Sequence, residues 1–494
     1  MSESLDLTAL GRPAAGAAAV LLPDGAIVPY GHLDRLVGAA ARQLDWPAKA
    51  LVLVDAPRTL RGVVGYLAAL RSGHAVMLIE HGSEPVWADV IDGYRPELLI
   101  LEPSDTPAGL APGWGYHRRA GGGLPVWRRT AGAEPGGAIH PDLAMIIRTS
   151  GSLGAPKTVR LSFANLRANA VAIAEALRIR PGDRALASLP LDFSFGLSIL
   201  NSHLAAGAAT GLTSAAPSSA EFWWCADQMR VTCLGAVPAT FRFLRARRWD
   251  PRDHPSLRRV LQAGGALDTG TIAHIGRQMR AAGGDLVVMY GQTEATARIA
   301  YLPPELLEER LGSVGIAIPG GRISIRAPDG IPARDGQAGS VLYQGRNVMM
   351  GYARSRKDLA AGDTQRGLLR TGDLGCLRDG FLYLSGRADR QVKALGRRVD
   401  LDQVELAFAG RGIAAAAVPG PGERVHVVVE TSAAAIAAAH CRSVTTRFGL
   451  PGAAMVVAAV TEIPRTSRGK VDYAAVRRVV EPCRHLPGQP ADER

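Results

Sequence analysis

LVLVDAPRTLRGVVGYLAALRSGHAVMLI, residues 51–79, places a short apolar run on either side of an amphipathic segment. The runs LVLV (51–54) and AVMLI (75–79) have the length of buried strands. Between them, apolar residues recur at helical spacing, at Leu60, Val63, Val64, Leu67 and Leu70. A third run, ELLIL (97–101), and an earlier helical pattern from Leu33 to Leu44 extend the alternation. Strands alternating with helices are typical of a doubly wound sheet, so we expect an α/β fold here.

The rest of the chain indicates two domains. Its 494 residues exceed what one hydrophobic core usually organises. Residues 102–141 are rich in Gly and Pro without a period, which predicts a long irregular connection. A second α/β stretch runs from Ala144 to about Arg387, and the run VHVVV (425–429) with an alanine-rich helical segment follows. We therefore expect a large domain over 1–388 and a small α+β domain over 389–494.

Composition favours a globular protein. Hydrophobic residues make up 47%, charged residues 21%, and the mean hydropathy is +0.06. No apolar run reaches the roughly 18 residues that cross a bilayer. Glu3 and Asp6 stand where a signal peptide needs positive charge, so we expect a cytoplasmic protein without a membrane partner. The five cysteines are widely spaced without a CxxC pair, which predicts neither a disulfide framework nor a zinc site.

The basic residues are almost all arginines. The net charge of +12 comes from scattered arginines that do not interleave with aromatics, so we do not expect a nucleic-acid partner. An ammonium and a guanidinium are not interchangeable at a reacting phosphate or carboxylate, which makes the rare lysines informative. There are five lysines, namely Lys49, Lys157, Lys357, Lys393 and Lys470.

A glycine-rich loop, TSGSLGAPKT (149–158), follows the apolar run at 144–147. Small residues let backbone N–H groups close on phosphate oxygens, while hydroxyls and a lysine add donors and positive charge. These groups come from Thr149, Ser150, Gly151, Ser152, Gly154 and Lys157. Pro156 stands where a Walker loop needs its second glycine and has no N–H to donate, which disfavours a Walker-type NTPase. Taken alone, the segment could also be an ordinary turn between strand and helix.

This loop resembles the TSGSTGxPKG signature of the adenylate-forming (AMP-binding) superfamily, which includes acyl-CoA synthetases, peptide-synthetase adenylation domains and luciferases. It departs from the signature at Leu153, where a hydroxyl residue is usual, and at Thr158, where glycine is usual. The resemblance implies a large N-terminal domain of doubly wound mixed sheets, joined by a hinge to a small mobile C-terminal domain. It also implies ATP and Mg²⁺.

Two further motifs resemble the adenine and phosphate sides of that family's site. QAGGA (262–266) resembles the turn that runs beside the adenine, formed here by Gly264, Gly265 and Ala266. MYGQTE (289–294) resembles the YGxTE motif, with Gly291 and Gln292 at its centre. Tyr290 offers a flat face to a base, Thr293 a hydroxyl to the α-phosphate, and Glu294 a hard oxygen ligand to Mg²⁺.

Three more motifs follow in the family's order. LRTGDL (369–374) resembles the TGD motif, in which Asp373 would accept hydrogen bonds from the ribose hydroxyls. SGRADRQVK (385–393) resembles the GRxDxxxK element, with Arg387 reaching the nucleotide and Asp389 acting as the hinge. IPRTSRGK (463–470) resembles the PRTxxGK loop. Its Lys470 would be the catalytic lysine that bridges the substrate carboxylate and the α-phosphate.

The resemblance implies two half-reactions: formation of an acyl-AMP with release of pyrophosphate, then transfer of the acyl group to a thiol. Between them the small domain would rotate, withdrawing Lys470 and presenting the face from Lys393 to Val399. We expect no carrier domain after Lys470, so the thiol would belong to CoA or to a separate phosphopantetheinyl carrier protein. A non-catalytic nucleotide sensor is the rival from another class, and the presence of Lys470 counts against it.

The acid itself depends on LPLDFSFGL (189–197), which supports two alignments. One places it on the PLFHxxG motif of acyl- and aryl-CoA synthetases, with Phe193 replacing the histidine and Gly196 matching the glycine. The other places it on the FDxS motif of amino-acid adenylation domains, with Asp192 pairing a substrate ammonium and Ser194 as the serine. A buried acid without a partner is costly, so Asp192 either meets a cation or lies at the surface. An ordinary or aryl acid and an amino acid both remain open.

Overall fold

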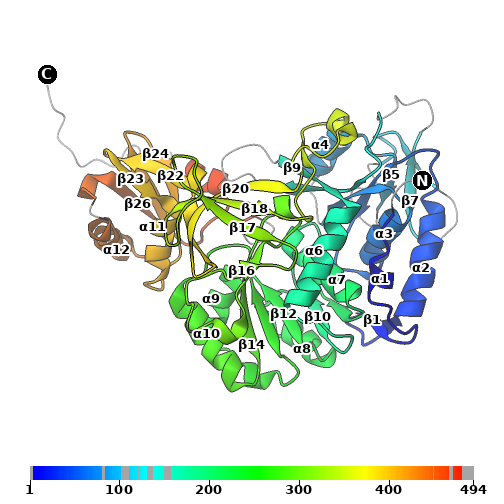
Figure 1. Cartoon of the computed structure of the whole chain (residues 1–494), viewed down its shortest axis with the longest axis horizontal. Coiled ribbons are helices and arrows are strands. Elements are labelled where there is room, and N and C mark those ends of the chain that lie inside the picture. The colour runs from blue at the N-terminus through cyan, green and yellow to red at the C-terminus, as the bar shows by residue number, and fades with distance from the viewer. Residues whose placement is uncertain are drawn as a thin grey trace.

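The computed structural model of the chain describes residues 4–80, 84–101, 111–119, 123–130, 137–149, 157–448, 450–466 and 471–480. Three sheets and their helices form a large body as far as Arg387, and a small α+β body follows (Figure 1). The N-terminal strands and the small body lie at opposite ends of the long axis (Figure 1). This is the fold class that the sequence predicts. In the part of the chain that the structure describes, no helix has the length and apolar character that a membrane span requires.

An eight-stranded mixed sheet occupies the N-terminal end of the large body. Its spatial order is β19-β9-β8-β4-β3-β5-β7-β6. The bounds are β3 Leu51–Asp55, β4 Ala75–Ile79, β5 Leu98–Ile100, β6 Tyr116–Arg118, β7 Val126–Arg129, β8 Leu143–Thr149, β9 Lys157–Ser162 and β19 Gly351–Ala353. The central strands β3, β4 and β8 run parallel, and every residue of β3 and β4 is buried. Parallel strands covered on both faces explain the continuous apolar runs in the sequence.

The stretch 102–141 differs from the irregular connection that its composition predicts. Within its described parts, β6 and β7 pair with each other, and β7 pairs with β5 at the edge of the sheet. The Tyr116 hydroxyl donates to the Pro96 carbonyl oxygen at 2.6 Å. Strands of three and four residues are too short to show a period in a Gly- and Pro-rich sequence, which is why the pattern missed them.

A nine-stranded sheet forms the second layer, in the order β16-β15-β14-β13-β12-β10-β11-β1-β2. Its strands from β10 to β14 run parallel, whereas β14 and β15 are antiparallel. The bounds are β1 Ala18–Leu21, β2 Ile27–Pro29, β10 Arg184–Ala187, β11 Ala209–Leu212, β12 Cys233–Ala236, β13 Arg259–Gln262, β14 Asp285–Tyr290, β15 Ala300–Tyr301 and β16 Ile316–Ala317.

Helices join and cover these two sheets. Every residue of α7 is buried, and one core cluster contains Val20 of the second sheet together with Val52 and Val76 of the first. The helices are α1 Leu7–Leu10, α2 Tyr30–Gln43, α3 Leu60–Arg71, α4 Glu84–Tyr94, α6 Phe163–Ala176, α7 Ser194–Ala205, α8 Ala220–Gln228, α9 Pro238–Ala246 and α10 Thr269–Ala281, with short 3₁₀ turns η1 Pro251–Asp253, η2 Thr293–Ala295, η3 Pro304–Leu306 and η4 Arg356–Ala360. The helix α7 therefore lies in the core that the two sheets share.

A four-stranded antiparallel sheet leads from the large body to the small one. It consists of β17 Arg322–Arg326, β18 Gly339–Gln344, β20 Leu368–Arg378 and β21 Phe381–Arg387. The small body then follows as η5 Ala388–Arg390, β22 Gln391–Ala394, β23 Arg397–Asp400, α11 Leu401–Ala409, β24 Ala415–Gly420, β25 Arg424–Glu430, α12 Ala434–Arg447, η6 Gly452–Ala454, β26 Met455–Val460 and α13 Tyr473–Val480.

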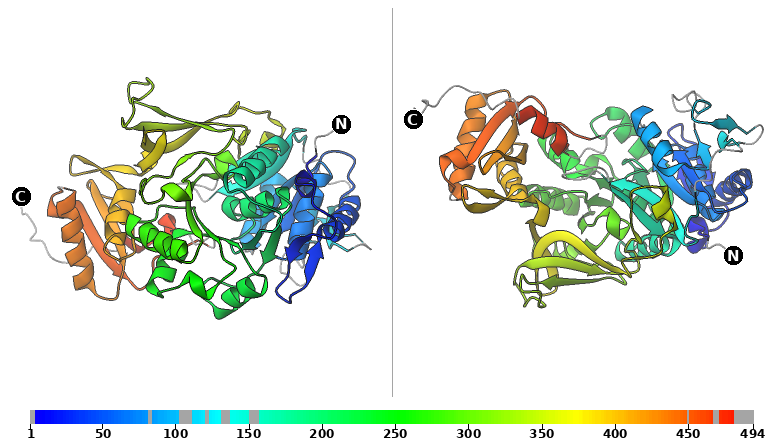
Figure 2. Two further views of the ribbon diagram at one scale, coloured as in Figure 1. Left: turned by 60° about the horizontal axis from the view of Figure 1, so that its bottom comes forward. Right: turned by 90° about the horizontal axis from the view of Figure 1, so that it is seen from above.

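The small body has its own hydrophobic core. Val404 and Phe408 of α11 pack with Val427 of β25 in a cluster that contains only residues C-terminal to Arg390. The predicted strand at 425–429 lies within β25. Figure 2 shows this body beside the four-stranded sheet, at one end of the molecule in both views. A separate core of this kind is what a domain that folds and moves as a unit requires.

Candidate active site

The C-terminal end of β14 and the middle of β20 bring polar residues of two motifs together. The Tyr290 hydroxyl donates to the Asp373 carboxylate, and Gln292 Nε2 donates to the Thr371 carbonyl oxygen at 3.2 Å. Burial raises the pKa of Asp373 to about 6, and burial beside that carboxylate raises the pKa of Tyr290 well above its usual range. A buried carboxylate with a neighbouring donor can accept hydrogen bonds from two vicinal hydroxyls, as a ribose offers them.

The turn after Tyr290 requires glycine. A Cβ on Gly291 would lie 1.8 Å from the carbonyl oxygen of Ala297, so no other residue fits without moving the backbone. Thr296, at the end of η2, has a left-handed φ of 62°. This tight return presents Thr293 and Glu294 next to the Tyr290 and Asp373 pair.

Glu294 and Lys157 meet through Tyr352. The Tyr352 hydroxyl donates to Glu294 Oε1 at 2.9 Å, and the Lys157 ammonium lies 5.2 Å from the centre of the Tyr352 ring. Burial and the Glu294 charge raise the pKa of Tyr352, so its hydroxyl stays a donor. The antiparallel pairing of β19 with β9 brings Tyr352 to this place. A cation and a carboxylate at one edge suit a polyphosphate with its metal ion.

The two flanks of the glycine-rich loop are held together. Thr149 lies opposite Lys157 in the pairing of β8 with β9, and its Oγ1 donates to the Lys157 carbonyl oxygen at 3.1 Å. The loop residues Ser150, Gly151, Ser152 and Gly154 lie outside the described residues. The loop therefore begins and ends beside Glu294 and Tyr352, where the resemblance expects phosphates.

Glu294 fits a magnesium ion as a single protein ligand. No group of three or more His, Cys, Asp or Glu side chains that could hold a metal occurs among the residues with described positions. Magnesium usually takes one or two carboxylates and completes its shell with substrate phosphates and water. Glu294 would supply the one carboxylate of such a shell, and it is only half-buried, so phosphates and water could reach it.

The start of α7 lies against the same centre. Ser194 Oγ lies 3.1 Å from Thr293 Oγ1, which joins the 189–197 segment to the YGxTE motif. Phe193 is buried and packs edge to face on Phe195, with ring centres 6.1 Å apart. A Cβ on Gly196 would lie 2.3 Å from the Pro190 carbonyl oxygen, so the glycine allows α7 to begin this close to the preceding turn.

The GGA turn lies on the other side of these rings. Gly264 has φ +86°, and a Cβ there would lie 3.5 Å from the Phe193 ring. Gln262 Nε2 donates to the Gly265 carbonyl oxygen at 2.9 Å, and Arg242 Nη2 donates to the Ala266 carbonyl oxygen at 3.4 Å. The half-buried Asp192 and Phe193 directly precede α7, and Gly196 lies in its first turn, so the three predicted pocket residues are close together at the start of that helix.

Lys470 lies outside the described residues, but the flanks of its loop are placed. Arg465 and Val471 form an antiparallel bridge, and the Asp472 N–H donates to the Pro464 carbonyl oxygen at 2.9 Å. Burial lowers the pKa of Arg242, and the nearby charge of Arg465 lowers it further. The charge of Arg465, at the base of the PRTxxGK loop, therefore acts on the arginine that contacts the GGA turn.

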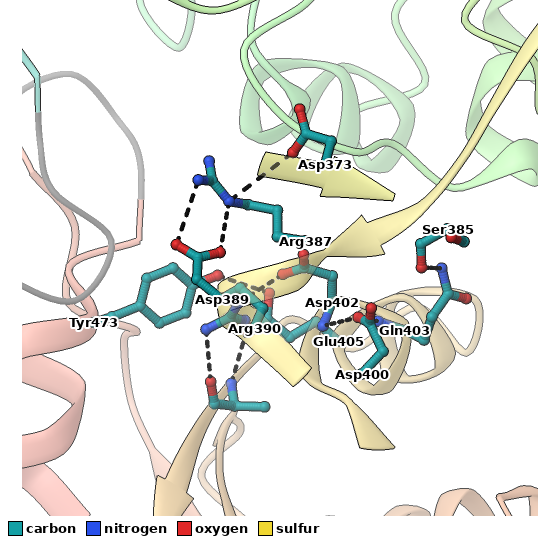
Figure 3. A network of polar contacts seen from close by, with 11 residues as sticks. Asp373, Ser385, Arg387, Asp389, Arg390, Asp400, Asp402, Gln403, Glu405 and Tyr473 are labelled. Carbon is teal, nitrogen blue, oxygen red and sulfur yellow. Dashed lines mark hydrogen bonds and ion pairs between the residues drawn. The ribbon is translucent and has the colours of Figure 1, made fainter. Parts of the chain in front are cut away.

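Arg387 and Arg390, on either side of Asp389 in the chain, have partners in different parts of the molecule (Figure 3). On the side of the large domain, Arg387 Nε donates to Asp389 Oδ1 at 2.9 Å and lies 3.9 Å from Asp373 Oδ1. On the other side, Arg390 is 2% exposed, and its partners among the described residues belong to the small body. Its nitrogens lie 2.7 Å from Asp402 Oδ1 and 2.5 Å from Glu405 Oε1. Between Arg387 and Arg390, the partners of the side chains therefore change from the large body to the small body.

The Arg390 cluster is completed by α13. The guanidinium lies 4.0 Å from the centre of the Tyr473 ring, and the Tyr473 hydroxyl donates to Glu405 Oε2 at 2.9 Å. Arg390 Nη1 also donates to the Ala417 carbonyl oxygen at 3.1 Å. Burial raises the pKa of Glu405 to about 7 despite the neighbouring guanidinium.

Sequence patterns did not indicate three residues of this region: Tyr352, Thr371 as a partner of Gln292, and the buried Arg298 behind Phe195. Each is brought to the site by strand pairing or by a turn, and neither Tyr352 nor Arg298 stands in a motif. The TGD motif does contain Thr371, but its role here is carried by a backbone oxygen, which any residue would supply.

Comparisons with known proteins show a matching family and similar relatives. A family model described as AMP-binding enzyme matches residues 8–353. The sulfoacetate–CoA ligase of Cupriavidus necator is 33% identical over 355 residues, which cover 69% of this chain and 68% of that protein. The L-proline–[L-prolyl-carrier protein] ligase of Pseudomonas fluorescens is 27% identical over 97% of this chain and 88% of its own length.

A solved structure shows the same fold over nearly the whole chain. The O-succinylbenzoate coenzyme A synthetase of Bacillus subtilis, in complex with ATP and a magnesium ion, superposes with a TM-score of 0.75. The alignment covers 95% of this chain and 98% of that one at 22% identity, so it concerns the fold.

Proposed function

Because the chain belongs to the AMP-binding enzyme family, and to its AMP-forming acid–thiol ligases, we propose the following pair of reactions for it. It activates a small carboxylic acid with ATP and Mg²⁺ as an acyl adenylate. It then passes the acyl group to the thiol of a pantetheine arm.

One observation carries this proposal. Tyr290, paired with Asp373, precedes Thr293 in the chain, and Glu294, which Tyr352 joins to Lys157, directly follows it. We assign the first pair to the nucleoside and the second to the phosphates. Thr293 in turn contacts Ser194 at the mouth of α7. An α-phosphate stands between ribose and pyrophosphate, so an acid held near Ser194 would meet it at Thr293. This order supports attack of a carboxylate on the α-phosphorus.

In the first half-reaction, a carboxylate oxygen bonds to the α-phosphorus, and the bond to the bridging oxygen of pyrophosphate breaks. Lys157 and the loop groups Ser150, Gly151, Ser152 and Gly154 would hold the leaving pyrophosphate. Thr293 would orient the α-phosphate, and Lys470 would neutralise charge between carboxylate and phosphate. Magnesium held by Glu294 would offset the remaining phosphate charge.

In the second half-reaction, the thiol sulfur bonds to the acyl carbon, AMP leaves with the bonding electrons, and the thiol proton is released. We propose that residues 389–494 rotate about Asp389 relative to residues 1–388. The support is that the partners change there. Arg387 binds Asp389 and lies near Asp373 of the large body, while Arg390 binds Asp402 and Glu405 of the small body. Rotation would replace the Lys470 loop by the face of β22 and β23, on which Lys393 is exposed.

The acceptor is proposed to be CoA or a separate phosphopantetheinyl carrier protein, because both present the same pantetheine thiol. One relative is named a CoA ligase and another a carrier-protein ligase. Incubating the enzyme, its acid and ATP with CoA or with a loaded carrier protein, followed by mass spectrometry of the thioester, distinguishes them.

Exchange of labelled pyrophosphate into ATP across a panel of acids tests the first half-reaction. We expect exchange that depends on one acid class and on magnesium. Failure of every aliphatic, aryl and amino acid to support exchange above the acid-free rate would contradict the proposal.

An amino-acid substrate is the second candidate. The observation in its favour is that Asp192 lies directly before Phe193, at the entrance to α7, where a carboxylate could meet a substrate ammonium. Exchange with an amino acid and not with its deaminated analogue would establish this alternative.

A further inference from the structure

Four arginines are buried in the part of the chain that the structure describes: Arg160, Arg298, Arg356 and Arg390. Three of them, Arg160, Arg356 and Arg390, each bind several oxygens. Arg356 binds both oxygens of Glu97, Arg390 binds Asp402 and Glu405, and Arg160 donates to the carbonyl oxygens of residues 350, 352, 361 and 362. This is the usual condition for burying a guanidinium, because its charge is costly to remove from water.

Arg298 lacks such partners. Its Nε lies 3.4 Å from the Met289 sulfur, and its Nη1 lies 3.5 Å from the carbonyl oxygen of Ala297. The guanidinium carbon lies 4.0 Å from the centre of the Phe195 ring. No aspartate or glutamate whose position is described forms a hydrogen bond or ion pair with it. Burial lowers its pKa to about 9, so the side chain stays charged near neutral pH.

This charge is fixed beside the proposed acid pocket. The Arg298 carbonyl oxygen accepts from Asn169 Nδ2 at 3.3 Å and from Asn347 Nδ2 at 2.9 Å, which anchors its backbone. Phe195, on which the guanidinium lies, packs edge to face on Phe193. Both rings line the Gly264 turn, because a Cβ there would lie 3.5 Å from Phe193 and 3.8 Å from Phe195.

We propose that Arg298 is a specificity-determining residue that binds a second anionic group, a carboxylate or a sulfonate, at the far end of the acid substrate. This inference rests on the proposed function and names the class of acid within it. A planar guanidinium pairs with either oxyanion through two parallel hydrogen bonds. The bound anion would supply the negative charge that no described carboxylate supplies to Arg298. The same charge repels an ammonium, which makes an amino acid the poorer substrate.

Matched acids test the inference in the wild-type enzyme. Butanoate is compared with butanedioate, and 4-methylbenzoate with benzene-1,4-dicarboxylate, so that each pair differs at the far end. Pyrophosphate exchange reports turnover, and the shift of the melting temperature in the presence of MgATP reports binding. We expect the member with the distal carboxylate to be favoured by about tenfold or more in kcat/KM in at least one pair.

Substitution assigns the preference to Arg298. Arg298→Met should lower kcat/KM for the diacid by about 30-fold or more and change the mono-acid by less than about threefold. Arg298→Lys keeps the charge and should retain part of the preference. Arg247→Met is the matched control, because Arg247 also stacks on a phenyl ring, that of Phe243 at 5.6 Å, but is exposed. It should change neither acid.

The outcomes separate the two proposals. Equal use and equal thermal stabilisation by both members of each pair in the wild type would overturn the anion site, as would equal loss of both acids in a folded Arg298→Met protein. If Arg298→Met does not fold, the wild-type panel and Arg298→Lys decide. Thermal stabilisation by the diacids without pyrophosphate exchange would support the anion site and refute the proposed function.

Discussion

Asp373 gives the site a dependence on pH. Its pKa is raised from 3.8 to about 6. In the empty protein this raised pKa contributes stability that is present below about pH 4 and lost as the pH rises through 6. Nucleotide binding should have the opposite sign, because only the carboxylate accepts from both ribose hydroxyls. We therefore expect ATP affinity, measured by calorimetric titration, to weaken as the pH falls from 7 to 5.

Two variants check this assignment. Asp373→Asn should bind ATP about 10- to 100-fold more weakly at pH 7.5, since a hydrogen bond to a charged group contributes about 1.5–3 kcal/mol, and its affinity should not change between pH 5 and 7. Tyr290→Phe removes the donor that favours the carboxylate form, so the midpoint of the pH dependence should move upward. An unchanged pH dependence in Asp373→Asn would show that another group titrates.

Asp192 distinguishes the two substrate classes. If it pairs a substrate ammonium, Asp192→Asn should cost about 2–5 kcal/mol of binding, because a buried charge then loses its partner. If the pocket holds an uncharged or anionic acid, the nearly isosteric change should alter kcat/KM by less than about tenfold, or 1.4 kcal/mol. Steady-state kinetics with the native acid and its amino analogue measure the difference. A native amino-acid substrate that tolerates Asp192→Asn would exclude the FDxS alignment.

Residues within motifs could be predicted, and residues between motifs could not. Short sequence motifs contain Tyr290, Thr293, Glu294 and Asp373, and the residue types in these motifs indicate their chemistry without a structure. Arg298 follows Glu294 by four positions, yet among so many arginines nothing marks it. It is set apart by its burial with a sulfur, a phenyl ring and a single distant carbonyl oxygen as its partners among the described residues.

The short element η5 is the proposed hinge. Two substitutions of Asp389 separate the effect of its backbone φ from the effect of its side chain. Asp389→Pro fixes φ and should allow acyl-adenylate formation but block thioester formation. Asp389→Ala is the control, because it also removes the contact with Arg387 but leaves φ free. It should retain both half-reactions, measured by pyrophosphate exchange and by thioester yield. Equal loss of both half-reactions in Asp389→Pro would argue against a hinge there.

Arg390 joins η5 to α11 and α13, so the stability of the small domain should depend on it. Arg390→Ala leaves Glu405 and Asp402 without their cation, and breaking a buried pair from one side costs about 3–5 kcal/mol. We expect a separate, lower melting transition of the small domain by calorimetry of the full chain. Arg447→Ala, at the exposed end of α12, should leave the thermogram unchanged. A single unshifted transition in Arg390→Ala would show that the cluster is dispensable.

The elements follow the sequence where packing is two-sided and depart from it at edges. The run 75–79 is β4 and the run 51–54 lies within β3, because central parallel strands must be apolar on both faces. The edge strands β6 and β7 carry mixed side chains, with two exposed in β6 and three half-buried in β7. They are held by pairing of β7 with β5 and of β6 with β7, which no local pattern encodes. The sequence could predict the buried central strands and the helices beside them, but not the edge strands that widen the sheet.

At the scale of the molecule, the motifs are far apart in sequence and only the fold brings them together. Their order could be read from the chain through the family resemblance, whereas the orientation of the small domain could not, because a few residues around Asp389 determine it. Arg465, at the base of the PRTxxGK loop, is near enough to Arg242 of the large domain for its charge to lower the Arg242 pKa. In the proposed scheme this is the orientation of the adenylation step, in which Lys470 would serve the α-phosphate.

Lys470 therefore provides the test of the whole arrangement. If the small domain adenylates in this orientation and then turns away, Lys470→Ala should lower pyrophosphate exchange by about 10²- to 10³-fold, the usual effect of removing a group that stabilises developing charge. Thioester formation from preformed acyl adenylate should change by less than about threefold, because the lysine has left the site by then. Lys393→Ala, on the exposed face of β22, removes a lysine of the same domain and should leave exchange unchanged. Loss of both half-reactions in Lys470→Ala would mean that the lysine stays in place throughout, and the two-orientation scheme would then fail.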